Sequence, residues 1–194
     1  MRLQTLALAD DPATWSALGF AVDGDVVAVG GVALRLAGAS AGEGILGWSV
    51  SGLDSDVLPR VEPVLAGSAT VDHPNGAQAV DHVVALAGDL EAAIAGLEAG
   101  GLAPRRVREV PGGETRQAFF VLETALLELV GPAPEVDGPR FWGLTLVVAD
   151  LDALAARLGD RLGPVKDAVQ PGRRIATVRA GAGSSMPLAF MTPR

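Results

Sequence analysis

Two stretches of the sequence repeat one another, and this repeat constrains the fold more than any other feature. Residues 79–132 and 141–193 align at a constant offset of 61, which places Asp89 on Asp150. The same offset takes the letters ELVGP onto AFMTP near the end of each stretch. Because a unit of this length cannot bury one face of its own sheet alone, the repeat predicts two similar units packed against each other.

Each repeated unit is predicted to run strand, helix, then three strands. Residues 80–86 alternate in a way that predicts a strand, with His82 on the same face as its apolar neighbours two and four positions on. Asp89 is placed to cap a helix with apolar residues at helical spacing, and Gly100 with Gly101 ends it. Three β-rich runs follow, RRVREV, QAFFVLE and ALLELVG, and the second unit repeats this order.

The N-terminal part of the chain carries a poorer copy of the same order. Residues 2–38 begin with a short apolar strand, LQTLAL, and Pro12 then suits the first position of a brief helix that Gly19 ends. Three β-rich runs follow, separated by Asp23-Gly24 and Gly30-Gly31, which are hairpin signals. This stretch is therefore predicted to be a degenerate βαβββ module.

The next stretch is predicted to be a truncated relative without the final strands. Residues 45–52 favour a strand, and Asp54 is placed to cap a helix that Pro59 and Pro63 would shorten. The sequence thus predicts the degenerate and truncated modules over residues 1–76, and two full modules over residues 77–194, at 79–132 and 141–193.

Composition excludes several classes of protein. Of the 194 residues 49% are hydrophobic, which excludes a disordered chain. No apolar run approaches the roughly 20 residues that a membrane helix needs, and acidic residues near the N-terminus argue against a signal peptide. The absence of Cys rules out disulfides and thiolate ligands. The lack of Cys also fits a cytoplasmic protein, which we expect. A net charge of −8 argues against binding to nucleic acid or anionic membranes.

Tandem modules of this order, with His82 in the first strand and Glu128 in the last, resemble the vicinal oxygen chelate superfamily. That group includes glyoxalase I, extradiol dioxygenases, methylmalonyl-CoA epimerase and bleomycin-resistance proteins. The resemblance is strongest over HPNGAQAVDHVVALAGDL, RQAFFVLETALLELVGP and FWGLTLVVADLDALAARLG, which together look like bacterial glyoxalase-like domain proteins. It implies an α+β fold of tandem βαβββ modules whose mixed sheets form an open, barrel-like cleft with helices on the outside.

The resemblance also implies a metal site built from the first and last strands of paired modules. His82 and Glu128 match two of those positions, and imidazole with carboxylate suits a divalent cation. The offset of 61 maps them onto Gly143 and Ala189, which have no ligating side chain. The two repeated units together therefore carry only half of the expected ligands.

The N-terminal copy supplies one further candidate ligand. Aligning ALADD with ALAGD maps His82 onto Gln4, and aligning VALRLAG with ALLELVG maps Glu128 onto Arg35, a cation that would repel a metal. Some glyoxalase I relatives use Gln at that position, so the resemblance implies Gln4 as a third, weak ligand. Even without a metal, an imidazole beside a carboxylate can bind a polar ligand or move a proton, which makes His82 and Glu128 the candidate catalytic residues.

Other residues are candidates for binding a ligand at the cleft. Arg116 and Gln117 open a predicted strand in which Gln117 and Phe119 share a face, so we expect them at the cleft rim. Arg173 and Arg174 follow a comparable Pro-Gly turn in the last unit. Arg at a cavity mouth suggests a ligand with a carboxylate or phosphate, and a solvated strand end is the alternative.

Three functional hypotheses follow from these residues. The first is a glyoxalase-like protein that binds a small organic ligand between paired modules without a complete metal centre. The second is a lyase, isomerase or dioxygenase that uses a divalent metal on His82 and Glu128. The third is a structural or interaction module whose cleft is filled by its own side chains. The partner expected under the first two is a small molecule, and the fold type allows a homodimer.

Overall fold

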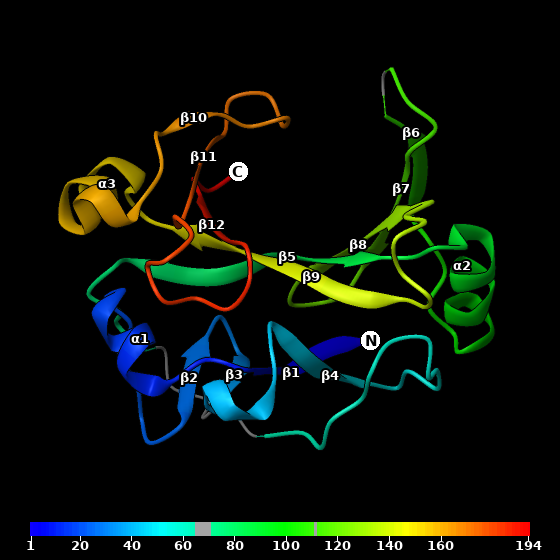
Figure 1. Ribbon diagram of the computed structural model, residues 1–194, viewed down its shortest axis with the longest axis horizontal. Helices are drawn as coiled ribbons and strands as arrows, with labels where there is room; N and C mark the ends of the chain where they lie inside the picture. Colours follow the sequence, from blue (N-terminus) through cyan, green and yellow to red (C-terminus); the bar gives the residue numbers. More distant parts are fainter. Residues whose placement is uncertain (65–70, 111) are drawn as a thin grey trace.

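The computed structural model describes residues 1–64, 71–110 and 112–194, and its strands form two sheets that pack face to face (Figure 1). The N-terminal part of the chain builds the smaller sheet, and the two repeated units together build the larger one. No helix among the described residues has the length and apolar character needed to cross a membrane.

The first repeated unit has the predicted order of elements. Its elements are β5 (Ala77–Leu86), α2 (Leu90–Ala99), β6 (Arg106–Glu109), β7 (Arg116–Val121) and β8 (Leu126–Gly131). Asp89 caps α2 because its carboxylate accepts a hydrogen bond from the backbone N–H of Ala92. The last strand returns to lie parallel beside the first, so that β5 pairs with β8.

The second unit repeats this arrangement and confirms the predicted βαβββ repeat. Its elements are β9 (Arg140–Val148), α3 (Leu151–Leu158), β10 (Lys166–Asp167), β11 (Arg174–Thr177) and β12 (Leu188–Met191), with a short 3-10 turn at Gly159–Arg161. Asp150 caps α3 by accepting from the backbone N–H groups of Asp152 and Ala153. Here too the last strand, β12, lies parallel to the first, β9.

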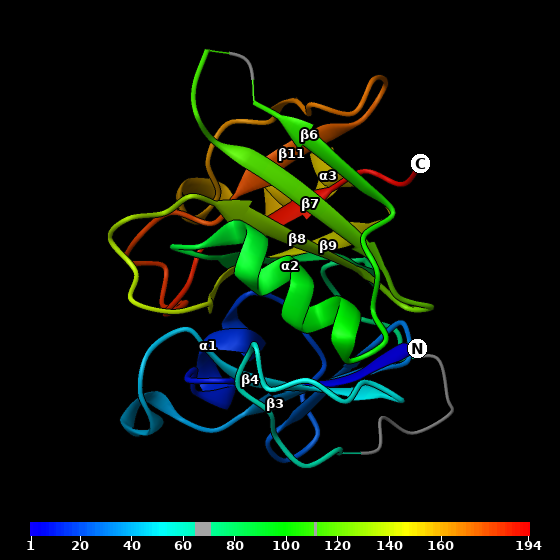
Figure 2. The same ribbon diagram turned by 90° about the vertical axis from the view of Figure 1, so that its right-hand side faces the viewer.

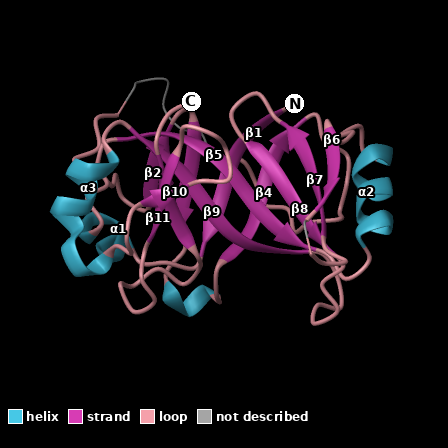
Figure 3. Cartoon of the chain, turned by 90° about the horizontal axis from the view of Figure 1, so that it is seen from above, coloured by secondary structure: helices cyan, strands magenta, loops and turns pink. Residues whose placement is uncertain are grey.

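The two units join through their first strands. β5 and β9 pair antiparallel, which gives one sheet of eight strands in the order β10-β11-β12-β9-β5-β8-β7-β6. The outer strands at both ends rise away from the smaller sheet, so the larger sheet is curved (Figure 1). The helices α2 and α3 lie outside at its opposite ends (Figures 2 and 3). The sheet therefore presents a concave face on the side away from the N-terminal sheet.

The smaller sheet repeats the connections of the larger one with fewer strands. It contains β1 (Arg2–Leu8), β2 (Val26–Val29), β3 (Val32–Leu36) and β4 (Ile45–Ser51), with α1 (Pro12–Ala17) after β1 and a 3-10 turn at Ala39–Ala41. The order is β2-β3-β1-β4, with β1 parallel to β3 and antiparallel to β4. The same parallel and antiparallel neighbours surround β5 in the larger sheet.

Two N-terminal predictions are wrong. The first β-rich run after α1 is not a strand, and only an isolated bridge joins Asp23 to Val26. The helix predicted after Asp54 is absent from the described residues 53–64. That segment instead runs along β4, where the Trp48 N–H donates to the Pro59 carbonyl and the Val61 N–H donates to the Trp48 carbonyl. Pro59 favours this extended path because it cannot donate within a helix. Residues 65–70 of the predicted truncated module lie outside the described residues.

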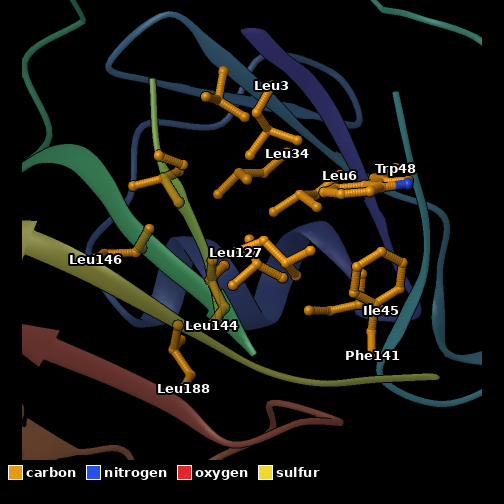
Figure 4. Close-up of a cluster of buried hydrophobic side chains, with 14 of the residues drawn as sticks. Leu3, Leu6, Leu34, Ile45, Trp48, Leu127, Phe141, Leu144, Leu146 and Leu188 are labelled. Atoms are coloured by element: carbon orange, nitrogen blue, oxygen red, sulfur yellow. The ribbon is translucent and has the colours of Figure 1, made fainter. Parts of the chain in front are cut away.

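The main hydrophobic core lies between the two sheets (Figure 4). Leu6 and Trp48 from the smaller sheet meet Leu127, Phe141 and their neighbours from the larger one. The Trp48 and Phe141 rings stand edge to face with centroids 5.5 Å apart. Full burial of each large apolar side chain contributes about 1.5–3 kcal/mol. One face of the larger sheet is thus buried in this core, and only its concave face can carry a binding site.

Candidate active site

A cavity of about 450 Å³ lies in the concave face of the larger sheet. Strands of both repeated units line it, and most of the lining side chains are apolar. The polar side chains in the lining are His82, Gln117, Glu128, Thr145 and Thr177. A cavity of this size and character suits a small organic molecule.

His82 points into the cavity because β5 alternates its side chains, and an irregularity in β5 brings Asp81 to the same side. Val83 belongs to the core between the sheets, whereas His82 lines the cavity. The register with β9 slips between Val80 and His82, which leaves Asp81 as the extra residue. Such a bulge re-aims side chains, and here the Asp81 carboxylate contacts the ring of His82.

Asp81 fixes the tautomer of His82. Its Oδ2 lies 2.8 Å from Nδ1 of His82, and its Oδ1 lies 2.7 Å from Nη2 of Arg173. Burial alone would raise the pKa of Asp81, but the hydrogen bond from His82 and the contact with Arg173 outweigh it and lower the pKa to about 2. Because Asp81 is then an acceptor only, the His82 proton sits on Nδ1 and Nε2 is left as a free acceptor.

Glu128 faces His82 across the floor of the cavity. Its Oε2 lies 4.0 Å from Nε2 of His82, too far for a hydrogen bond, while its Oε1 accepts from Nε2 of Gln117 at 2.6 Å. Oε1 of Gln117 in turn accepts from Nε of Arg108 at 2.7 Å. Burial raises the pKa of Glu128, against the opposing charges of His82 and Arg108. A ligand group placed between His82 and Glu128 would therefore meet two groups that can exchange protons.

The structure brings together some of the predicted residues. His82, Glu128 and Gln117 line one cavity. Gly143 and Ala189, the positions that the offset of 61 pairs with the first two, line it as well. The cavity is therefore built from corresponding positions of both units, but its ionisable side chains, His82 and Glu128, both come from the first unit.

Arg116 and Phe119 lie outside the cavity lining, although they share β7 with Gln117. Arg116 pairs with Glu91 on α2. The Arg108 guanidinium lies 5.2 Å from the centre of the Phe119 ring and covers it. The expected contact of Arg116 and Phe119 with a ligand remains a prediction.

Gln4 is not brought to His82 and Glu128. It lies in β1 of the smaller sheet, where its Oε1 accepts a hydrogen bond from the Ser49 hydroxyl at 3.4 Å. Arg35 in the same sheet is half exposed and lies 3.6 Å from Asp25. The N-terminal sheet packs on the opposite face of the larger sheet, so its side chains and the cavity are on different sides.

His73 serves the packing of the N-terminal part. It is buried, its Nδ1 accepts from the backbone N–H of Ala21 at 3.1 Å, and its Nε2 lies 2.9 Å from the carbonyl of Ala28. These contacts require the proton on Nε2, because Nδ1 must accept. Both ring nitrogens are thereby used, which leaves none for a ligand.

Sequence reasoning missed Asp81 and Trp142 as site residues. Alternation along β5 would point Asp81 away from the side of His82, and only the bulge brings its carboxylate to the His82 ring. Trp142 is half exposed and lines the cavity wall, although an apolar run in a strand is more typical of core. The adjacency of Asp81 and His82 in the sequence was the available signal for the first.

The donor set does not fit a metal centre of three or four side chains, which is the number that bound metals usually need. His82 and Glu128 are the two facing donors, and within the described parts of the chain no group of three or more His, Asp or Glu side chains is placed to hold a metal. At Gly143 an added Cβ would come within 2.8 Å of the Pro187 carbonyl oxygen, so backbone occupies the place of a further ligand.

Solved structures match this fold, although no family model matches the sequence and no curated protein is significantly similar to it. Methylmalonyl-CoA epimerase from Mycobacterium tuberculosis is 22% identical, covers 61% of this chain and 90% of its own, and has a TM-score of 0.50. A Streptomyces coelicolor methylmalonyl-CoA epimerase in complex with 2-nitronate-propionyl-CoA is 20% identical and also has a TM-score of 0.50. The match covers 60% of this chain and 97% of the epimerase chain. A methylmalonyl-CoA epimerase in complex with methylmalonyl-CoA and NH4+ is 19% identical and has the same TM-score of 0.50. This match covers 60% of this chain and 94% of the epimerase chain.

Identities this low show the fold alone. The matched share of this chain corresponds in length to residues 77–194, the two repeated units. The match to these structures confirms the expected α+β fold with open mixed sheets.

Proposed function

We propose that the protein binds a small organic ligand in the cavity that His82 and Glu128 line, with a polar group of the ligand held between these two residues. The observation that carries this proposal is the 4.0 Å separation of Nε2 and Oε2 across an otherwise apolar cavity of about 450 Å³. Neither atom completes a hydrogen bond with the other, and both residues line the cavity, where a bound molecule can reach them. A ligand group that bridges the two atoms gains a hydrogen bond to each of them.

The cavity itself argues against a cleft filled by its own side chains. Its volume lies within the usual range for small-molecule sites, roughly 300–1,000 Å³. Trp142 adds a half-exposed aromatic surface to the wall. Flat or branched apolar groups pack well on such a surface. The ligand class that fits is therefore a mainly apolar molecule with a polar head.

The polar pair also supports proton exchange with the ligand. Asp81 keeps the proton on Nδ1 of His82, so Nε2 can accept a proton from a bound molecule. Glu128, with its raised pKa, can return one from the other side of the gap. The epimerases of similar fold are known in complex with CoA esters, so methylmalonyl-CoA is a natural first probe beside simpler molecules.

A divalent-metal-dependent lyase, isomerase or dioxygenase is the second candidate, because His82 Nε2 and Glu128 Oε2 both face the cavity. Elemental analysis of the purified protein separates the two candidates. About one transition metal per chain, lost in a His82→Ala variant, favours the metal enzyme, and substoichiometric metal favours the ligand-binding protein.

Trp142 provides a direct assay for binding. It is 48% exposed and lines the cavity, whereas Trp15 and Trp48 are 0% and 1% exposed. We expect tryptophan fluorescence to change saturably with methylmalonyl-CoA or with the uncharged probe phenylpropionamide. The Trp142→Phe variant should lose most of the signal while calorimetry still detects binding.

Variants of the polar pair test the proposal. His82→Ala and Glu128→Gln should weaken binding by about tenfold or more, the usual effect of removing a hydrogen bond to a charged or polar group. Glu135→Gln is the matched control, because Glu135 is exposed and lies outside the cavity lining. Unchanged affinity in both site variants, or no saturable binding of any probe to the wild type, would contradict the proposal.

A further inference from the structure

A second cavity of about 300 Å³ continues the concave face beyond His82. Its lining follows that of the larger cavity along the same strands. Leu126 and Val147 line the smaller cavity, two residues from Glu128 and Thr145, which line the larger one. In a strand, residues two apart share a face. The two cavities therefore lie next to each other along the same face of the larger sheet, and together they are called the trough below.

Arg173 lines the smaller cavity and is buried, with 5% of its surface exposed. Arg174 pairs with Asp152 at the surface, as expected for a solvated Arg at the end of a strand. Arg173 is not solvated in this way. Nε of Arg173 donates to the Thr192 carbonyl at 2.9 Å. Only this end of the guanidinium is tied to the backbone.

The remaining nitrogens of Arg173 are poorly satisfied. Nη2 lies 2.7 Å from Oδ1 of Asp81, but the direction of this contact does not meet that of a hydrogen bond. Within the described residues, Nη1 and Nη2 of Arg173 are the only buried side-chain nitrogen or oxygen atoms without a hydrogen-bond partner. A guanidinium remains charged at any ordinary pH, so these donors cannot be neutralised by losing a proton.

A buried charged donor without a hydrogen bond, such as Nη1 of Arg173, indicates a missing partner. Asp81 is already shared between Arg173 and His82, which leaves one edge of the guanidinium for another acceptor. The planar guanidinium fork matches a carboxylate especially well. A phosphate dianion would place more negative charge near Asp81 and Glu128 and is therefore less suited.

We propose that the smaller cavity receives the carboxylate of an organic acid whose apolar body lies in the larger cavity, with Arg173 as the cation that binds it. This proposal rests on the proposed function, since it names the class of ligand for the same trough. Val121 and Arg194 also line the smaller cavity and are exposed, so this end of the trough opens to solvent and a carboxylate can enter it beside Arg173. The ligand then spans from Arg173 to the gap between His82 and Glu128.

Isothermal titration calorimetry on the full chain with phenylpropionate and phenylpropionamide tests this proposal, because the two probes differ in charge and hardly in shape. We expect the wild type to bind the acid at least about tenfold more tightly than the amide, because a charge-assisted hydrogen bond is stronger than a neutral one. Arg173→Gln should abolish this preference and leave the affinity for the amide within about threefold. Arg174→Gln is the matched control from the same turn and should keep the preference.

Val121→Glu tests the same site without altering the buried Arg173. Val121 is 54% exposed and lines the smaller cavity, so the new carboxylate can occupy the place of the ligand's own. We expect this variant to bind phenylpropionate at least about tenfold more weakly, while the isosteric control Val121→Gln binds it as the wild type does. This result is decisive even if Arg173→Gln fails to fold.

Equal binding of acid and amide by the wild type would overturn the carboxylate site while the proposed function stands. The same holds if Arg173→Gln keeps the preference, or if Val121→Glu leaves the acid's affinity unchanged. Displacement of phenylpropionate by inorganic phosphate at lower concentration than by acetate would overturn the choice of a carboxylate. A wild type that binds neither phenylpropionate nor phenylpropionamide would overturn the carboxylate site, and it would overturn the proposed function as well if methylmalonyl-CoA also fails to bind.

Discussion

Replacing Asp81 with asparagine removes the charge that joins Arg173 to His82 in the floor of the trough. The side chains of Asp81 and Arg173 are each 5% exposed, so their ion pair is shielded from solvent. The asparagine side chain would keep the shape of the aspartate that it replaces. It would leave the guanidinium without a counter-charge and His82 without its charged acceptor.

The magnitude follows from the pKa of Asp81. Folding lowers this pKa from 3.8 to about 2. A shift of that size corresponds to about 2 kcal/mol of stability. Loss of one partner from a buried pair adds the cost of an uncompensated charge, so we expect Asp81→Asn to lower the free energy of unfolding by about 3 kcal/mol at neutral pH.

The pH dependence has a definite sign. Because the folded pKa lies below the unfolded one, the stabilisation from Asp81 is present above the unfolded value of 3.8 and disappears as the pH falls through about 2. The difference between wild type and Asp81→Asn should therefore shrink over that acidic range. Urea unfolding of both proteins at a series of pH values, followed by circular dichroism, measures it.

Glu128 provides an internal control of opposite sign. Burial raises its folded pKa above the ordinary value of 4.5, so its ionised form destabilises the fold at neutral pH. Glu128→Gln should raise the free energy of unfolding at neutral pH, and this gain should vanish as acid protonates the wild-type carboxylate. Asp152→Asn, at an exposed ion pair with Arg174, should leave the pH profile almost unchanged.

The reasoning is refuted if Asp81→Asn unfolds within about 0.5 kcal/mol of the wild type at neutral pH, which is the usual scatter of surface substitutions. It is equally refuted if the two proteins lose stability in parallel between pH 3.8 and about 2. Either result would mean that Arg173 and His82 do not hold Asp81 in its charged form.

Two further predictions concern the packing around the site. Gly143→Ala should lower the free energy of unfolding by about 1–3 kcal/mol in urea titrations, because its Cβ would meet the Pro187 oxygen at 2.8 Å, whereas Gly138→Ala has nothing within 4 Å and should change little. A loss as small as that of Gly138→Ala would contradict the close approach. Trp48→Ala should cost about 3–5 kcal/mol, because Trp48 is fully buried against Phe141 between the sheets. Thermal unfolding measures this cost, and an unchanged midpoint would show that the sheets do not share a core.

Local sequence signals predicted most of the larger sheet. Asp89 and Asp150 stand at the helix starts that they were expected to cap, and both carboxylates accept backbone hydrogen bonds. The repeat at an offset of 61 predicted equivalent strands, and alternation in β5 predicted the face that carries His82. Such features depend on short-range geometry, so they can be read without knowing the rest of the fold.

The N-terminal half was predicted less well because its local signals compete. Asp54 followed by apolar residues indicated a helix, but the segment gains backbone hydrogen bonds by running along β4. Gln4 aligned with His82, yet its sheet packs on the face opposite the cavity. Which face of a sheet is covered depends on how whole sheets stack, and alignment of two strands says nothing of it.

The sequence by itself determined the repeated βαβββ units and their capped helices, because each depends on residues close together in the chain, and the family resemblance implied that His82 and Glu128 share a site. Only the tertiary structure decided what those positions can do. A single extra residue in β5 turns Asp81 toward His82, and the turn before β11 brings Arg173 to Asp81 from 92 positions away. Charges so distant in sequence act together only once the two units share one sheet, where burial makes their mutual pairing strong.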